Sequence, residues 1–444
     1  MGLVAGVLGL NLAFAAAGYA VLSAVAPLRP SYLGVAHVCG AAATGVVVFL
    51  LAIAGLHVDL LSLVLALALV AIGGIVAARV VGREPARTPS SSLDPAGAML
   101  LAAVVAVLAL VLLGGFRTAP TLDDAWGIWL PKGVALGAHG LDSRLFVPNG
   151  RYVAFEVPDY PLWWSSVSEL GLRFVGKVDV RVMNAQLALL LLGFAGAVAR
   201  LLWGRVRPWL LAGGLLLLVA SPELLRHVQS GGADLVLGMF VALFGLGAAL
   251  WLIEADRLGL VVAGVCGAAA LATKTEAAAE LAIVLAVALV AARRRRAALL
   301  VAAAAAYATL VPWWIWKAVH DVPDRVPLRD ALDPSYLADR ADRVGHSAST
   351  LAGHMIDPTE WLFVVPLLVV LCIAAARRHR AAVAPLVAVV LGWAFLVWVY
   401  WAAPDDLDYL LGTSAYRTVD PFILLAAVSL PPLAELVLRE RYSR

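Results

Sequence analysis

Two adjacent aspartates, Asp123 and Asp124, follow a long apolar run and precede two tryptophans and a lysine in the segment TLDDAWGIWLPKG. A helix N-cap explains one aspartate here, because a carboxylate accepts backbone N–H groups and suits the positive end of the helix dipole. The second carboxylate and the aromatic neighbours fit a general base or a metal-binding pair better. A carboxylate at a boundary between water and lipid can have a raised pKa, which suits proton abstraction near neutral pH. Asp123 and Asp124 are therefore the candidate catalytic residues, and Lys132 is a candidate donor-binding residue.

Further acidic groups stand close to apolar sequence. The segment EVPDYPLWW places Asp159 and Tyr160 between two prolines, which predicts a rigid extended turn. Asp159 is either a preorganised acid that faces the same cavity as Asp123, or part of a loop that turns back to the membrane. In GGADLVLGMF, Asp234 opens an apolar run, where an N-cap is the simpler explanation. We keep Asp159, Tyr160 and Asp234 as candidate substrate- or donor-binding residues.

The segment LATKTEAAAE interrupts apolar sequence with Lys274, Glu276 and Glu280. Charged side chains are costly inside a membrane, so such an interruption indicates a functional site. Glu276 and Glu280 are four residues apart and share one helix face. The alternative is a structural ion pair in which Lys274 meets an acid from a neighbouring span. Lys274 and Glu276 are candidate donor-binding residues.

The segment PDDLDYLLGTSAYRTVDPF combines acidic residues with Ser414 and Arg417. An arginine suits phosphate because its fork of donors matches the phosphate oxygens. The alternative for Arg417 is an interfacial arginine that extends its head group to water. We take Asp408, Ser414 and Arg417 as further candidate donor-binding residues.

The elements that would position these groups are membrane spans. The chain has 444 residues, of which 63% are hydrophobic and 14% charged, whereas soluble proteins have about 45–50% and about 25%. Apolar runs long enough to cross a bilayer recur along the whole chain, which indicates an all-α polytopic membrane protein. We predict about 13 transmembrane helices, at residues 3–27, 33–56, 58–80, 98–116, 182–202, 208–221, 234–253, 259–273, 276–292, 297–318, 361–376, 381–402 and 417–437.

The connecting segments separate by charge. Arginine clusters such as RRRR at 293–296 and RRHR at 377–380 fall on one side of the predicted spans, and the segments 117–181, 319–360 and 402–416 fall on the other. Basic loops stay in the cytoplasm, so the N-terminus is predicted outside and the C-terminus inside. All candidate residues then lie on the outer side. Within the first outer loop, aromatic spacing predicts interfacial helices near 125–138 and 160–175.

An outer position limits the chemistry. Nucleotide sugars and ATP are confined to the cytoplasm, and the chain has neither of the complete phosphate-binding motifs GxxxxGK[ST] and GxGxxG. An outer-face transferase must therefore use an activated group that is already linked to a lipid, such as a polyprenyl phosphate. Cations must then stabilise the leaving phosphate, and a carboxylate must deprotonate the acceptor hydroxyl. The candidate residues supply both kinds of group.

The chain resembles the GT-C glycosyltransferases, a multi-span class that uses polyprenyl-phosphate sugars, and especially bacterial members similar to the protein mannosyltransferase and aminoarabinose transferase group. Those enzymes carry an acidic pair in the first large outer loop, matched here by Asp123 and Asp124 in DDAWGIWLPK. PDYPLWW resembles their DYP-Leu stretch, GGADL their glycine-Ala-Asp-Leu stretch, and TKTEA a Thr-Lys-Asn-Glu-Gly run. DLDYLLGTSAYR resembles a segment with an aspartate, an aromatic residue, a histidine and a leucine followed by Thr-Ser and Arg. The order and approximate spacing agree over residues 98–420. Thr275, Ala277 and Leu410 depart from the pattern, which would fit an unusual substrate.

The resemblance implies a GT-C-like core over residues 98–444, with residues 1–97 as three extra N-terminal transmembrane helices. It implies a bacterial plasma membrane enzyme in which a loop aspartate is the base of an inverting displacement. The expected partners are a polyprenyl-phosphate sugar donor, a glycan, lipid or protein acceptor, and the lipid bilayer, with no nucleic acid. No cofactor is assigned, and metal use stays open, since an acidic pair could hold Mg²⁺ or Mn²⁺. The alternatives are a transporter or flippase, and a protein that only binds or assembles a partner.

Overall fold

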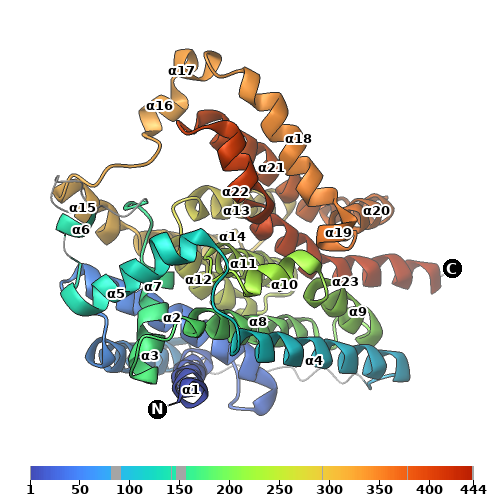
Figure 1. The fold of residues 1–444 in the computed structure, drawn as a ribbon. Helices are drawn as coiled ribbons and strands as arrows, with labels where there is room; N and C mark the ends of the chain where they lie inside the picture. The colour runs from blue at the N-terminus through green and yellow to red at the C-terminus, as the bar shows by residue number, and fades with distance from the viewer. Residues whose placement is uncertain are drawn as a thin grey trace.

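The computed structural model describes residues 2–81, 92–141, 143–146, 157–292, 294–377 and 379–442, which form helices and contain no β-strand (Figure 1). The chain is thus an all-α polytopic membrane protein. In chain order the elements are α1 (Leu3–Leu22), η1 (Pro30–Tyr32), α2 (Leu33–Ile53), α3 (Leu60–Val81), α4 (Pro95–Gly115), η2 (Ala125–Trp129), α5 (Leu130–His139), α6 (Ser143–Phe146), α7 (Trp163–Val175), α8 (Arg181–Leu202), α9 (Pro208–Val219), α10 (Pro222–Val228), α11 (Asp234–Glu254), α12 (Arg257–Leu271), α13 (Ala277–Ala291), α14 (Arg296–Ala308), α15 (Val311–Val319), α16 (Leu328–Leu332), α17 (Pro334–Ala338), α18 (Asp342–Ile356), α19 (Pro358–Trp361), α20 (Val364–Ala376), η3 (Arg380–Val383), α21 (Ala384–Ala402), α22 (Leu407–Thr418) and α23 (Asp420–Tyr442).

The predicted number of spans is not confirmed. Within the described residues, 9 helical segments are long and apolar enough to cross a membrane, or 10 if α9 and α10, bent by 61°, form one span. The predicted spans 259–273, 276–292 and 361–376 fold as α12, α13 and α20, which have 15, 15 and 13 residues. At about 1.5 Å per residue, these helices reach about 20–23 Å, less than the hydrocarbon core of about 30 Å.

Local sequence explains where several helices begin. The Asp94 carboxylate accepts the Gly97 N–H, and Pro95 occupies the first helical position, so α4 starts with both features of a favourable N-terminus. Asp406 accepts the Tyr409 N–H in the same way and starts α22. Most of the predicted loop 402–416 is therefore helical, and α22 leads directly into α23.

The first three helices pack onto the rest of the bundle. Residues of α1 and α2 belong to the same buried apolar cluster as residues of α7, α8, α11 and α12. Glycines bring α1 and α2 close together, since a Cβ added at Gly18 would lie 1.6 Å from the carbonyl oxygen of Ala36. Such close backbone approach at small residues is typical of helix packing in membranes. Residues 2–81 therefore share one core with the later helices.

Both predicted interfacial helices are present as helices, but their surroundings differ. Residues 125–139 form η2 and α5, whose Trp126 and Val134 are exposed. The helix α7, by contrast, is buried along almost its entire length against α1, α2, α5 and α8. Small side chains permit this close packing: a Cβ added at Gly171 would lie 2.4 Å from a methyl group of Val182. The helix α7 is thus enclosed by protein instead of lying against lipid.

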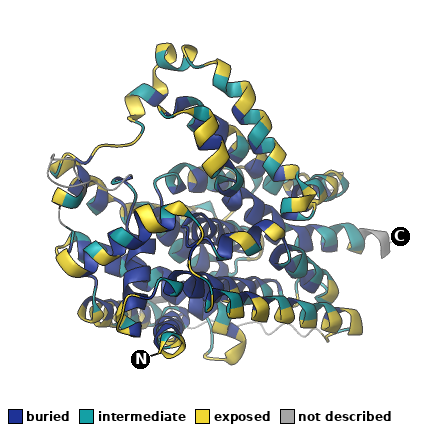
Figure 2. Cartoon of the chain, in the orientation of Figure 1, coloured by how far each residue is buried: buried dark blue, intermediate teal, exposed yellow. Residues whose placement is uncertain are grey.

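The helices α16, α17 and α18 form an arch above α22 at the top of Figure 1. Few of their residues are buried, whereas the buried residues concentrate in the middle of the bundle (Figure 2). Hydrogen bonds to the neighbouring helix α21 fix the arch: the indoles of Trp398 and Trp401 in α21 donate to the carbonyl oxygens of Ala331 and Leu337, and the hydroxyl of Tyr336 in α17 donates to the Ala402 carbonyl. The charged cavity described next lies between this arch and the bundle.

Candidate functional site

A cavity of about 1430 Å³, called here the charged cavity, opens between the bundle and the arch. Ligand pockets usually measure about 300–1,000 Å³, so this cavity is larger than most of them. Segments from many parts of the chain line it, including nine of the eleven residues predicted from the sequence. These nine are Asp123, Asp124, Asp159, Tyr160, Asp234, Lys274, Glu276, Ser414 and Arg417.

Five of these side chains form a continuous ion network. Arg417 Nη1 lies 2.6 Å from Asp124 Oδ2 and 3.1 Å from Asp234 Oδ2. Lys274 Nζ lies 2.7 Å from Asp234 Oδ1 and 3.6 Å from Glu276 Oε1. The Asp234 carboxylate therefore bridges the two cations and holds them side by side.

The bridging position of Asp234 excludes the simpler explanation that its side chain is a helix N-cap. Its side chain caps no helix, although it lies in the first turn of α11, where the helix dipole favours a negative charge. Asp124 likewise makes no capping bond. Lys274 does form the ion pair with a neighbouring helix that the sequence allowed. The side chains of Arg417, Asp234 and Lys274 are only 9%, 7% and 7% exposed.

The acidic pair is held in place by backbone bonds. The N–H groups of Thr121 and Leu122 donate to the carbonyl oxygens of Gln229 and Ser230, at 3.0 and 3.2 Å. Gly231 has a φ of +72°, and a Cβ there would lie 2.7 Å from Pro120, so this close approach requires a glycine. The loop 229–232 is thus a platform for the segment that carries both aspartates.

The two aspartates of the pair have different surroundings. Asp124 is bound to Arg417, with its side chain 26% exposed. Asp123 is exposed, lines the charged cavity, and makes no hydrogen bond or ion pair with the part of the chain that the structure describes. The sequence alone did not distinguish them.

Asp159 and Tyr160 form another wall of the cavity. The Tyr160 hydroxyl donates to Glu276 Oε1 at 2.9 Å, and its ring stacks on Trp129 at 5.5 Å. The backbone carbonyl of Asp159 accepts a bond from the Trp313 indole, whereas its Oδ1 atom is buried without a hydrogen-bond partner among the described residues. Burial raises the pKa of the Asp159 carboxyl.

Lys132 is not among the lining residues of the charged cavity. Its side chain is fully buried, donates to the Val157 carbonyl, and lies 5.8 Å from the centre of the Tyr160 ring. Burial lowers the pKa of the ammonium group to about 7, against the opposing effect of Asp159. Lys132 therefore supports the aromatic wall from behind, and the prediction that it contacts the donor directly does not fit this position.

Asp408 also lies away from the cavity. Its side chain is 87% exposed and is 3.2 Å from His346. Residues six apart on a helix are separated by about 240°, so Asp408 and Ser414 cannot share a face of α22, whereas Ser414 and Arg417, three apart, can. The Ser414 hydroxyl lies 2.7 Å from the Tyr400 hydroxyl.

Further charged residues of the cavity were not among the sequence candidates. Lys317 pairs with Asp324, and Arg325 Nη2 lies 3.0 Å from Asp405 Oδ2. Lys317 could have been noticed, because it stands alone at the end of a long apolar run. Arg325 and Asp324 gave no such signal, since nothing in their local sequence distinguishes them from other charged loop residues.

A second group missed by the sequence analysis lies beside the ion network. His227 of α10 stands between two buried carboxylates, with Nδ1 2.8 Å from Asp420 Oδ2 and Nε2 2.8 Å from Glu223 Oε1. We call these three residues the histidine cluster. The i, i+4 spacing of Glu223 and His227 was a usable signal, but Asp420 could be matched to them only in three dimensions.

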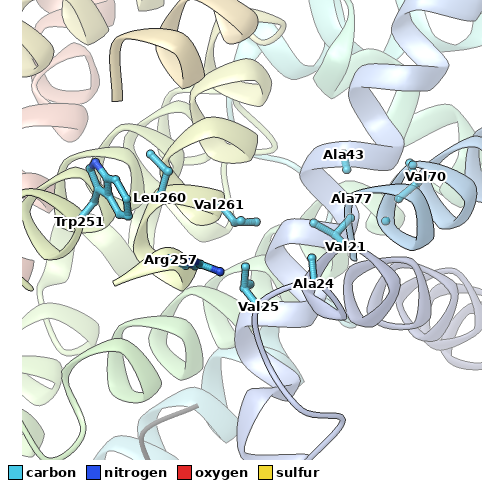
Figure 3. Close-up of a pocket in the computed structure, with 12 residues that line it drawn as sticks. Val21, Ala24, Val25, Ala43, Val70, Ala77, Trp251, Arg257, Leu260 and Val261 are labelled. Carbon is cyan, nitrogen blue, oxygen red and sulfur yellow. The ribbon is translucent and has the colours of Figure 1, made fainter. Parts of the chain in front are cut away.

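Two other features were sought. In the residues that the structure covers, no group of three or more His, Cys, Asp or Glu side chains is arranged to hold a metal ion. A separate apolar groove of about 520 Å³ lies between α1, α2 and α3 on one side and α11 and α12 on the other, with Trp251 and Arg257 at its edge (Figure 3).

Comparisons with protein-family models, curated proteins and solved structures found no match.

Proposed function

We propose that the chain is a bacterial plasma membrane glycosyltransferase with a GT-C-like core, which moves a sugar from a polyprenyl-phosphate donor to an acceptor hydroxyl on the extracytoplasmic side. The observation that carries this proposal is the shared cavity of two neighbouring cations, Lys274 and Arg417, and an unpaired carboxylate, Asp123. Such an arrangement suits a reaction with an anionic leaving group and a hydroxyl nucleophile.

In this mechanism the donor phosphate binds between Arg417 and Lys274. Asp234, which bridges both cations, fixes their separation before the donor arrives. Preorganised cations at the leaving oxygen stabilise the charge that develops in the transition state, with no reorganisation during the reaction. The phosphate replaces Asp124 as the partner of Arg417.

Asp123 acts as the base. The acceptor oxygen attacks the anomeric carbon, its proton passes to the Asp123 carboxylate, and the bond from that carbon to the phosphate oxygen breaks with its electron pair on the phosphate. The configuration at the anomeric carbon is inverted. Asp123 is the better candidate for the base, because it needs no ion pair to open before it meets the acceptor, whereas Asp124 is bound to Arg417 before the donor arrives. The size of the charged cavity allows donor head group and acceptor to meet there.

A second candidate function is a transporter or flippase for a lipid-linked or small solute. The observation that favours it is the bend of 61° between α9 and α10, since broken helices commonly form transport sites. The charged cavity would then be a binding site without chemistry.

The test uses wild-type protein in vesicles that contain a synthetic polyprenyl-phosphate sugar and candidate acceptors, with protein-free vesicles as the control. A glycosyltransferase releases free polyprenyl phosphate and forms a glycosylated acceptor, both measurable by mass spectrometry. A flippase moves the intact donor from one leaflet to the other and releases no polyprenyl phosphate. Movement of intact donor without release would contradict the proposed function.

A further inference from the structure

The histidine cluster lies outside the charged cavity and cannot contact a substrate there. Glu223, His227 and Asp420 are 0%, 3% and 0% exposed and do not line the charged cavity. Around them lie Arg226, which pairs with Glu223 at 2.7 Å, and the rings of Trp361 and Tyr416, at 6.1 and 5.6 Å from the His227 ring. Burial of charged groups costs free energy unless they form ion pairs and hydrogen bonds with one another. We therefore asked what the cluster does at this position.

On one side the cluster is connected to the acidic pair. The carbonyl oxygen of His227 accepts a bond from the Ser230 hydroxyl, and the same hydroxyl accepts the N–H of Gly232. This loop is the platform that binds the backbone of Thr121 and Leu122. A short chain of hydrogen bonds therefore links His227 to the backbone that carries Asp123 and Asp124.

On the other side the cluster is connected to Arg417. Asp420 lies three residues after Arg417, at the junction of α22 and α23. The bond between His227 and Asp420 thus joins α10, next to the platform, to the junction of α22 and α23, while the ion pair between Asp124 and Arg417 joins the acidic pair to α22 at the cavity surface. One connection is inside the cavity, and the other is behind it.

We propose that the histidine cluster is a positioning brace, with His227 as its central residue, which keeps the Asp123–Asp124 segment aligned with Arg417 when substrate opens the ion pair between Asp124 and Arg417. This inference rests on the proposed function for the identity of that substrate, an anionic donor. The brace is needed because one of the two carboxylates that hold Arg417 on the cavity side is then lost, and of the two Asp234 alone remains. A displacement of about 1 Å in such a site can lower the rate about 10²-fold.

The test measures the distance between the two segments directly. Spin labels are attached to Gly127→Cys and Gly412→Cys, two exposed positions where a Cβ meets no other atom. The natural cysteines Cys39, Cys266 and Cys372 are buried, so they do not compete for the label. The labelled protein should show one narrow distance distribution, with and without added polyprenyl phosphate.

Removal of the brace should broaden that distribution. We expect His227→Ala and Asp420→Ala to broaden it, most strongly with polyprenyl phosphate present, and to lower turnover up to about 10²-fold. Asp420→Asn should keep it narrow, because the amide oxygen still accepts a bond from His227. The matched control is His37→Ala, which removes a buried histidine bonded to Asn11 at 2.7 Å, outside the charged cavity. It should lower the melting temperature and leave the distribution narrow.

The outcomes separate the two proposals. If wild type transfers no sugar, the proposed function fails, while the distance measurement still tests the brace. Wild-type distributions in both His227→Ala and Asp420→Ala would overturn the brace, and so would equal broadening in His37→Ala. If His227→Ala does not fold, the triple variant Glu223→Gln, His227→Leu, Asp420→Asn removes the bonds without an isolated buried charge, and its distribution decides the question.

Discussion

The charged cavity and the apolar groove use the same two helices at opposite ends. The helix α11 contributes Asp234 to the cavity and Trp251 to the groove, and α12 begins with Arg257 beside the groove and ends next to Lys274. Asp234 and Trp251 are 17 residues apart, about 25 Å along a helix. Charged groups are therefore concentrated at one end of α11 and α12, and apolar groups line the groove at the other end.

The groove is lined by small and apolar side chains, with Arg257 as its charged member (Figure 3). The cavity holds paired carboxylates and cations whose side chains are mostly buried. A buried charge persists only with partners, and loss of one partner costs about 3–5 kcal/mol. The comparison predicts that substitutions in the cavity affect the reaction strongly, whereas substitutions in the groove affect packing alone.

The largest effect is expected at the acidic pair. Asp123→Asn removes the proposed base and should lower turnover about 10²–10⁴-fold. Asp124→Asn removes the carboxylate that the donor phosphate must displace from Arg417, so it should instead lower the donor KM, with a smaller loss of turnover. Steady-state transfer kinetics at varied donor concentration separate the two effects. Asp179→Asn, an ion-paired aspartate of the same predicted loop outside the cavity, serves as the control. Full activity in both single cavity variants would show that neither aspartate is the base.

Arg417→Lys should have the next largest effect. A lysine keeps the charge but cannot form the paired bonds of the guanidinium with phosphate oxygens, so we expect about a 10²-fold loss of turnover. The control is Arg343→Lys, at an arginine that binds backbone carbonyl groups near the cavity without lining it. Equal rates for wild type and Arg417→Lys at all donor concentrations would transfer the phosphate-binding role to Lys274.

Lys132 should affect stability as a function of pH. Burial lowers its pKa to about 7 in the folded protein, compared with about 10.4 for an unperturbed lysine. Between these values the unfolded chain binds more protons, so stability rises with pH across this window. Lys132→Met should lack this rise, whereas Lys177→Met, at an exposed lysine, should keep it. Melting temperatures of the three proteins from pH 7 to 10 provide the measurement, and parallel curves would contradict the assignment.

The smallest effect is expected in the groove. A Cβ at Gly73 meets no atom within 4 Å, so the side chain of Gly73→Leu should fill the groove. The sugar-transfer rate should stay within about twofold of wild type. The melting temperature should rise slightly, because leucine has a higher helix propensity than glycine. The adjacent Gly74→Leu should destabilise the protein, because its Cβ would lie 2.3 Å from the Ala20 carbonyl oxygen. Transfer rates and melting temperatures of both variants test this pair. A loss of transfer in Gly73→Leu at unchanged stability would make the groove part of the site.

The sequence by itself determined the class of the protein and most of the charged groups that meet in the cavity. Apolar runs are readable without a structure because crossing a bilayer requires them, and Lys274, Asp234 and Arg417 were noticeable because charges beside such runs are costly. The interruption at Lys274 also marked the break between α12 and α13. Span length was not readable in the same way, since α13 and α20 are shorter than the predicted spans 276–292 and 361–376.

Only the tertiary structure decided which of these groups touch. Asp234 became a bridge between Lys274 and Arg417 because three separate helix ends converge there, and no local pattern encodes that convergence. Lys132 and Asp408 are charged like the residues of the site, yet both lie outside the cavity. The packing of α5 buries Lys132, and Asp408 lies on a different face of α22 from Ser414 and Arg417. The bond between His227 and Asp420 joins residues 193 positions apart. Charge type is a property of local sequence, whereas proximity depends on how helices pack over the whole chain.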